Sequence, residues 1–225
     1  TINKKNKIWK IKVNIIMLGS PGAGKGTQAQ TIAKKYNLKQ LSTGDLLREE
    51  IKNKTDIGKE IEHIISKGEF ATDYIVNELL KKTIIKTEFR NNIIFDGYPR
   101  NINQAKNLDL IINSDNQSLN FIIFLKVTKE IIEKRILGRL ICENCNHIFN
   151  EFDNSEELEK ICCNSKKISK RKDDNLQAII NRYDEYTRHT KPVLDFYSAR
   201  NNYFEIDGGE KIEVITAKIE EILKA

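Results

Sequence analysis

A glycine-rich stretch near the N-terminus has the residue types and spacing that bind phosphate. It reads Gly-Ser-Pro-Gly-Ala-Gly-Lys-Gly-Thr over residues 19–27, after an apolar stretch typical of a buried strand (Lys12–Leu18) and at the start of a predicted helix (Gly24–Tyr36). Glycines permit backbone angles that let successive N–H groups converge on one anion, and the helix N-terminus adds partial positive charge. Lys25 would supply a full charge to the β- and γ-phosphates of a nucleotide. A glycine-rich turn without a ligand is the alternative, but it does not explain a lysine at this position.

The segment Leu41–Arg48 combines a helix cap with a cation. Ser42 or Thr43 can cap a helix that starts near Gly44. Arg48 follows one turn later, where its guanidinium can bind a phosphate through two parallel hydrogen bonds. By itself this pattern also fits a capped amphipathic helix with a solvated arginine.

A second polar segment ends a predicted buried strand, Asn92–Phe95. Asp96 comes directly after it, at the carboxyl end, where ligands bind in open α/β sheets. A carboxylate at this place can hold the water shell of Mg²⁺. Arg100 and Gln104 follow a few residues later. The alternative is an ordinary turn, because Asp-Gly is a common turn pair.

All four cysteines lie in one short stretch, at Cys142, Cys145, Cys162 and Cys163. Disulfides that staple a whole domain would be dispersed, so the clustering indicates a local site. A Cys-x2-Cys pair with a third cysteine about 17 residues later suits zinc. The alternative is a metal-free segment held by hydrogen bonds and thiol packing.

The elements that must position these residues alternate between strands and helices. Further strands are predicted at Phe121–Val127 and Tyr203–Ile206. Helical spacing marks the following ranges: Leu46–Lys54, Gly58–Ser66, Tyr74–Thr87, Ile102–Ile112, Lys129–Leu137, Asn175–Tyr186, Pro192–Ala199 and Ile212–Leu223. The polar stretch Cys142–Lys172 is predicted to be irregular. The alternation predicts a parallel sheet covered by helices on both faces.

Composition limits the possible classes of protein. The 225 residues are 39% hydrophobic and 31% charged, which is ordinary for a globular protein. No apolar run approaches the roughly 18–20 residues of a membrane span. The net charge of +6 could indicate an anionic partner, but the lysines are scattered, which favours compositional drift. No apolar signal-peptide core precedes the first strand. We expect a cytoplasmic protein, or an organellar one if a targeting segment was trimmed.

Taken together, these motifs resemble those of the adenylate kinases, over roughly Val13–Leu223. Gly26 stands where Ser or Thr usually follows the loop lysine, and that departure from the general P-loop pattern is itself typical of this family. The resemblance implies an α/β P-loop core with a five-stranded parallel sheet. It implies reversible phosphoryl transfer from Mg-ATP to AMP, giving two ADP, by a monomer that binds neither nucleic acid nor membranes.

The resemblance also implies roles for single residues. ATP would bind to Gly22, Ala23, Gly24, Lys25, Gly26 and Thr27. AMP would bind to Thr43, Arg48, Phe70, Ala71, Gly97, Arg100 and Gln104. Asp96 would hold Mg²⁺ through water. The catalytic cations would be Lys25, Arg100, Arg135, Arg139, Arg171 and Arg182. Such a set suits phosphoryl transfer, in which catalysis comes from alignment and from cations on the transferring group.

The cysteine stretch resembles the zinc-bearing lid of some bacterial adenylate kinases, with Cys142, Cys145 and Cys162 as ligands. The fourth ligand position falls at Ser165, a poor zinc ligand. The residues that could replace it are Cys163, His147 and Asp153.

The resemblance divides the chain into three parts. Residues 1–41, 72–137 and 175–225 would form the core, 42–71 an AMP-binding insertion and 138–174 the lid. Tyr98, Ala71 and Leu140 depart from the residues usual in the family, and the lid lacks the usual Tyr-His after its second cysteine.

Two other functions remain open. A related kinase could use GTP as donor or another monophosphate as acceptor, although Thr43 and Gln104 go with AMP in the family, where UMP/CMP kinases tend to carry Ala and Asn. A non-catalytic nucleotide-binding regulator is expected to lack Lys25 or several of the arginines, and all of them are present.

Overall fold

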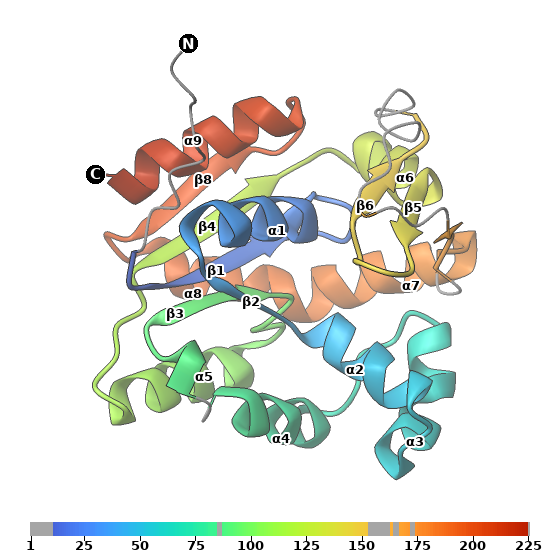
Figure 1. The fold of residues 1–225 in the computed structure, drawn as a ribbon, viewed down its shortest axis with the longest axis horizontal. Coiled ribbons are helices and arrows are strands. Elements are labelled where there is room, and N and C mark those ends of the chain that lie inside the picture. The colour runs from blue at the N-terminus through green and yellow to red at the C-terminus, as the bar shows by residue number, and fades with distance from the viewer. Residues whose placement is uncertain (1–10, 85–86, 153–162, 164–166, 172–173, 225) are drawn as a thin grey trace.

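A five-stranded parallel sheet forms the centre of the molecule (Figure 1). The computed structural model describes residues 11–84, 87–152, 163, 167–171 and 174–224. The strands of the sheet are β1 Val13–Gly19, β2 Lys39–Ser42, β3 Asn92–Asp96, β4 Phe121–Lys126 and β8 Tyr203–Asp207. They lie in the order β2-β3-β1-β4-β8, and each neighbouring pair is parallel. The predicted α/β class with a five-stranded parallel sheet is confirmed.

Helices cover both faces of this sheet, so the strands are apolar on both sides. The helices are α1 Lys25–Tyr36, α2 Thr43–Lys52, α3 Asp56–Ser66, α4 Asp73–Ile84, α5 Ile102–Ser114, α6 Lys129–Leu137, α7 Leu176–Glu185, α8 Lys191–Ser198 and α9 Ile212–Lys224. A short 3-10 turn, η1 (Thr87–Phe89), precedes β3, and a π-helical turn, η2 (Tyr186–Thr190), joins α7 to α8. In β1, Ile15 and Met17 pack with α1 and α9, whereas Ile16 and Leu18 pack with α4, α5 and α8. This period of two follows from the pleat of the strand.

Sequence periodicity located most of these elements to within a few residues. It missed strand β2, which has only four residues and includes the polar Lys39 and Gln40. Helical spacing also placed the start of α2 too late, at Leu46, whereas the capping pattern placed it near Gly44 and named Ser42 as a possible cap, which is confirmed. The helix begins at Thr43 because the hydroxyl of Ser42 accepts a hydrogen bond from the backbone N–H of Asp45 at 3.2 Å.

A second, smaller sheet follows α6. Its strands are β5 Arg139–Cys142, β6 Ile148–Asn150 and β7 Ile168–Ser169, in the antiparallel order β6-β5-β7. The prediction that the chain is irregular from Cys142 to Lys172 was therefore wrong for β6, for β7 and for the last residue of β5. They have two to four residues each, too few to show an alternating pattern.

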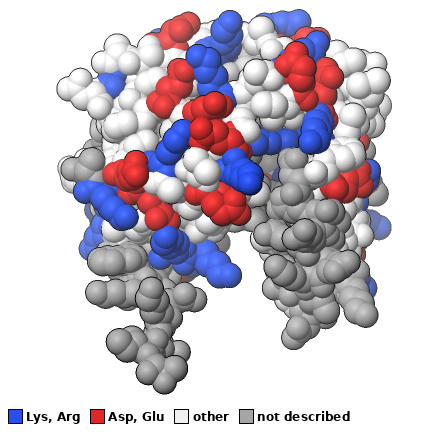
Figure 2. Space-filling model, turned by 90° about the horizontal axis from the view of Figure 1, so that it is seen from above, with Lys and Arg blue, Asp and Glu red and all other residues white. Residues whose placement is uncertain are grey.

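Charges on the surface are mixed in sign. On the face seen in Figure 2, Lys and Arg side chains alternate with Asp and Glu side chains, so the net charge of +6 does not gather there into one basic patch.

Within the described ranges, no helix is both long enough and apolar enough to cross a lipid bilayer.

Candidate nucleotide site

A cavity of about 830 Å³ lies at the carboxyl ends of β1, β2 and β3. Gly19, Ser42 and Asp96, the last residues of these strands, all line it. From β1 the chain passes to β2 on one side of the sheet, and from β3 it crosses to β4 on the other side of β1. Ligands of open α/β sheets bind at this kind of switch point.

The glycine-rich loop forms one wall of the cavity. Gly22 and Gly24 have positive φ angles of 77° and 93°, and Gly24 is the N-cap of α1, whose N-terminus therefore lies at the cavity. A side chain on Gly22 would come within 3.0 Å of the backbone oxygen of Ile132, so both conformation and packing require glycine there. All of the predicted ATP-binding residues except Ala23 line the cavity; the side chain of Ala23 is buried in the core.

Lys25 reaches back across this loop. Its ammonium donates hydrogen bonds to the carbonyl oxygens of Gly19 at 2.9 Å and Ser20 at 2.8 Å. The pKa of Lys25 is lowered to about 8: burial is the main cause, the charge of Asp96 opposes the shift, and the charges of Arg100 and Arg139 add to it. A phosphate beside this ammonium would stabilise its protonated form.

Asp96 faces Lys25 from the end of β3. Burial raises the pKa of its carboxyl group, and the charge of Lys25 partly offsets that shift. Gln40, on the neighbouring strand β2, donates a hydrogen bond to Asp96 Oδ2 at 2.9 Å. Sequence reasoning did not identify Gln40 because strand β2 itself was missed. Gly26 also lies here: a Cβ on it would be 3.4 Å from Asp96 Oδ2.

Residues of the predicted acceptor site meet around the carbonyl of Gly97. This carbonyl accepts hydrogen bonds from Thr43 Oγ1 and from Arg100 Nε, both at 2.8 Å. The guanidinium of Arg100 lies over the ring of Phe70, 4.6 Å from its centroid. Gly97 has a φ of 75°, and a Cβ would come within 3.2 Å of both Thr43 Oγ1 and Arg100 Nη2. The start of α2, the loop between α3 and α4 that carries Phe70, and the turn after β3 thus form one cationic and aromatic wall.

A smaller cavity of about 170 Å³ adjoins this wall. Its lining includes the predicted acceptor residues Thr43, Phe70, Ala71, Arg100 and Gln104, and Phe70 and Arg100 line the large cavity too. The Gln104 side chain, 3% exposed, bonds to the backbone N–H of Arg100 and to Asp73.

Two of the predicted catalytic arginines share one buried carboxylate. Arg139 bonds to Asp174 through two guanidinium nitrogens, and Arg182 lies 3.2 Å from the same carboxylate, whose side chain is 1% exposed. Burial lowers the pKa of Arg182 to about 9, and repulsion from Arg139 and Arg100 contributes. Asp174 was not identified as a site residue from sequence, although it ends the run that follows Arg171.

Arg171 approaches the acceptor helix. Arg48 bonds to Asp45 at 2.5 Å, and Arg171 lies 3.9 Å from the same carboxylate. Burial and the charges of Arg139 and Arg48 lower the pKa of Arg171 to about 9. Its Nε is buried without a hydrogen-bond partner among the residues that the structure describes. An anion in the cavity would offset the repulsion among these arginines and could accept a hydrogen bond from Arg171 Nε.

Arg135 is held differently from the other arginines. Its guanidinium donates hydrogen bonds to three backbone carbonyls, those of Gly208 at 2.6 Å, Glu210 at 3.3 Å and Ala23 at 3.5 Å. It thereby joins the phosphate loop to the segment after β8. All of the predicted catalytic cations, Arg135 included, line the same cavity.

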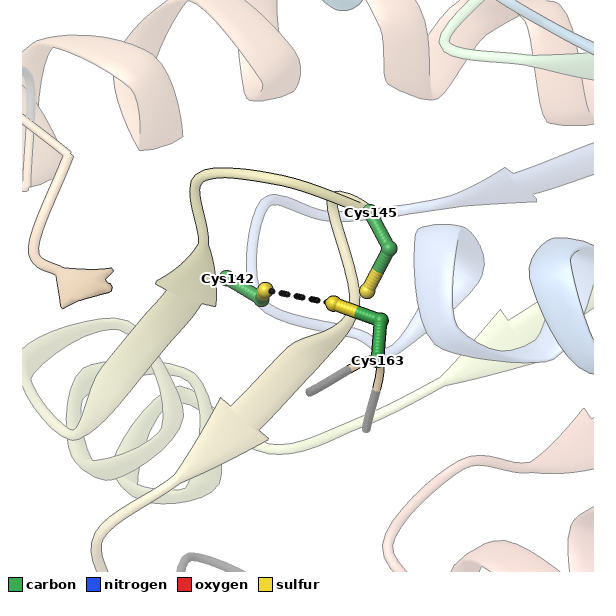
Figure 3. A group of neighbouring side chains, drawn as sticks. All are labelled: Cys142, Cys145 and Cys163. Carbon is green, nitrogen blue, oxygen red and sulfur yellow. Dashed lines mark hydrogen bonds between the residues drawn. The ribbon is translucent and has the colours of Figure 1, made fainter. Parts of the chain in front are cut away.

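Three cysteine thiols form a compact group in the small sheet. Cys142 ends β5, Cys145 follows in the turn before β6, and Cys163 comes from farther along the chain (Figure 3). Their sulfur atoms lie within 4.8 Å of one another, and Cys142 and Cys163 are 3.5 Å apart. Tetrahedral zinc with bonds of about 2.3 Å separates its thiolate ligands by about 3.8 Å, so the spacing fits that metal.

The other predicted zinc ligands have different outcomes. Cys162, Ser165 and Asp153 lie outside the described residues. His147 is not part of the thiol group; its ring packs edge-on against Phe149 at 4.6 Å. Of the two alternatives to Ser165 that the structure describes, His147 and Cys163, it brings Cys163 beside Cys142.

These features are those of a P-loop phosphotransferase. The glycine loop and the helix N-terminus lie at a switch point of the sheet, and a lysine and several arginines surround one cavity. Comparison with known proteins gives the family. The adenylate kinase family model matches residues 17–202. The chain is 55% identical over 212 residues to an adenylate kinase of Pelagibacter ubique, covering 94% of this chain and all of that protein. It is 38% identical over 212 residues to one of Rickettsia africae, covering 93% and 98%. The chain belongs to the adenylate kinase family.

Proposed function

We propose that this protein transfers a phosphoryl group reversibly from Mg-ATP to AMP, giving two ADP. The observation that carries the proposal is the convergence of Lys25 and the arginines on one cavity beside the phosphate loop. In phosphoryl transfer the developing charge lies on the transferring oxygens, and preorganised cations stabilise it. The names of the relatives, adenylate kinases over nearly the whole chain, support the same activity.

The two cavities suggest how the nucleotides are arranged. The donor phosphates would lie on the glycine loop beside Lys25. The acceptor phosphate would lie between Arg48 and Arg100, which extend from the two acceptor segments. The acceptor base would then enter the smaller cavity, where Gln104 supplies an amide.

Residues 42–71 and 138–174 would act as the acceptor-binding insertion and the lid. The small sheet of the lid reaches the phosphate loop, since the Ile148 side chain lies 3.3 Å from where a Cβ on Gly26 would be. Gln30, on α1, donates a hydrogen bond to the carbonyl of Asn146 at 3.0 Å. A lid in this position would exclude water, so that AMP rather than water receives the phosphoryl group.

Two metals fit the residues present. Asp96, a carboxylate facing the cavity beside Lys25, is the residue that we assign to the water shell of Mg²⁺, which neutralises phosphate charge when it is bound. For zinc we assign the thiols of Cys142, Cys145 and Cys163. Cys162 and Ser165 stay predictions for the remaining position.

A panel of donors and acceptors tests the activity. ATP and GTP would each be assayed against AMP, CMP, UMP and GMP with Mg²⁺. The highest kcat/KM for ATP with AMP is expected. Preference for GTP or for another monophosphate would assign a related kinase activity, and no turnover with any pair would indicate a nucleotide-binding regulator.

A further inference from the structure

Asp73 makes contacts that no substrate-binding or catalytic role yet explains. It is the first residue of α4 and lines the smaller cavity. Its Oδ1 accepts two hydrogen bonds, from Asn101 Nδ2 at 2.8 Å and from Gln104 Nε2 at 2.6 Å. Both donors belong to the segment that carries the proposed base-reading amide, so Asp73 acts on that amide from another helix.

These contacts determine which way the Gln104 amide points. The backbone N–H of Arg100, 2.8 Å away, can be met only by the oxygen of the amide. A carboxylate offers only acceptors, so the NH₂ end must face Asp73. The two neighbours make opposite demands at opposite ends of the amide. A flipped Gln104 would place N–H against N–H and oxygen against oxygen.

Asn101 closes the network. It is the N-cap of α5, and its Oδ1 accepts a hydrogen bond from the backbone N–H of Gln104 at 2.8 Å. Its Nδ2 is therefore the end that bonds to Asp73. Asp73, Asn101 and Gln104 form a ring of hydrogen bonds in which the orientation of both amides is fixed.

We propose that Asp73 is a positioning residue that selects a 6-amino purine monophosphate by holding the Gln104 amide in one orientation. An amide has two N–H groups and two lone pairs, and the contacts above use one of each. The other N–H and lone pair are left for a ligand. Adenine presents an acceptor at N1 and a donor at its 6-amino group, whereas hypoxanthine presents a donor at N1 and an acceptor at its 6-oxo group. The amide in its fixed orientation would pair with the acceptor and donor of adenine. A flipped amide would present its donor and acceptor in the reverse order, which suits hypoxanthine.

This inference rests on the proposed use of AMP. The test is Asp73→Asn, an isosteric change whose side chain can turn either an oxygen or an NH₂ toward Gln104. The ratio of kcat/KM for AMP to that for IMP is expected to fall by about tenfold, the effect of replacing a charged hydrogen-bond acceptor by a neutral one that no longer fixes the amide. The change should lie in the KM values for AMP and IMP, with kcat for AMP and the KM for ATP nearly unchanged.

Two comparisons separate positioning from a structural role. Asp56→Asn removes the same charge from the first residue of another helix, α3. Asp56 pairs with Lys59 and lines neither cavity, so this variant should leave the ratio unchanged. In a Gln104→Ala background, Asp73→Asn should have no further effect on the ratio. Because both substrates are measured on one preparation, loss of folded enzyme cancels from the ratio.

An unchanged ratio in Asp73→Asn, or the same fall with Gln104 already absent, would overturn the inference. Wild-type protein that transfers no phosphoryl group to AMP would instead overturn the proposed function.

Discussion

The phosphate loop and the cysteine lid both gather polar groups within a few ångströms, but by opposite means. Residues 19–27 form a contiguous run, and its conformation follows from glycine angles, a strand before it and a helix after it. The thiols of Cys142, Cys145 and Cys163 come from the end of β5, from the turn that follows it and from a segment before β7. The loop is thus specified locally, whereas the lid depends on how its strands pair.

The two regions are therefore expected to have different roles, the loop in the chemistry and the thiols in the stability of the lid. The loop carries Lys25, whose charge would act on the transferring phosphate, and none of the three cysteines that the structure describes lines the large cavity. Damage to the loop should therefore abolish chemistry with little effect on stability. Damage to the thiols should loosen the lid and leave the chemistry largely intact.

The largest effect is expected from Lys25→Ala. Loss of a preorganised donor at the transferring group typically reduces kcat by about 10²–10³-fold. Steady-state kinetics with ATP and AMP measure this, with Lys34→Ala on the same helix, an exposed lysine, as the matched control. A kcat in the Lys25 variant close to that of the wild type would end the catalytic role of the loop.

Arg48→Ala and Arg100→Ala should chiefly weaken use of AMP. Each removes a charged donor from the acceptor wall, so we expect the KM for AMP to rise by about ten- to a hundredfold. Calorimetry should show nearly normal ATP affinity. Arg90→Ala, which removes an arginine paired with Asp115 away from both cavities, is the control. Lost ATP affinity with normal AMP affinity would reverse the assignment of the two sites.

The pH dependence should report Lys25. Its pKa is lowered to about 8, so raising the pH through that value converts the ammonium to a neutral amine in the nucleotide-free enzyme. We expect kcat/KM for ATP to fall above about pH 8, approaching tenfold per pH unit at higher pH. Bound phosphates favour the charged form, so kcat should fall only at higher pH. Lys25→Arg keeps its proton, so its kcat/KM for ATP should not fall near pH 8. A fall at that pH in this variant would mean that another group titrates there.

The smallest effect on turnover is expected from Cys142→Ser. Metal bound by a lid contributes folding free energy locally, so the melting temperature should fall while the main sheet stays folded. Activity should fall far less than in Lys25→Ala. A chelator should destabilise the wild type and have no further effect on Cys142→Ser. Elemental analysis should find about one zinc per chain; no zinc, together with no effect of chelator, would mean that the lid folds without metal.

Sequence alone located the site residues that lie next, along the chain, to the strand or helix that positions them. The loop, the acceptor segments and the arginines were all placed on the elements that line one cavity. It missed partners that only tertiary structure brings near: Gln40 beside Asp96, Asp174 between two arginines, and Asp73 beside Gln104. Their positions follow from strand pairing and helix packing, which leave no local pattern. The small sheet was missed for the same reason, since its strands are too short for a period to show.

Phosphorus NMR of ATP and AMP incubated with the protein and Mg²⁺ tests the central claim most directly. The account predicts two ADP formed for each ATP consumed, approach to an equilibrium mixture, and no inorganic phosphate, because the acceptor site and lid direct the phosphoryl group to AMP. Inorganic phosphate released from ATP at a rate independent of AMP, or spectra unchanged after prolonged incubation, would contradict it.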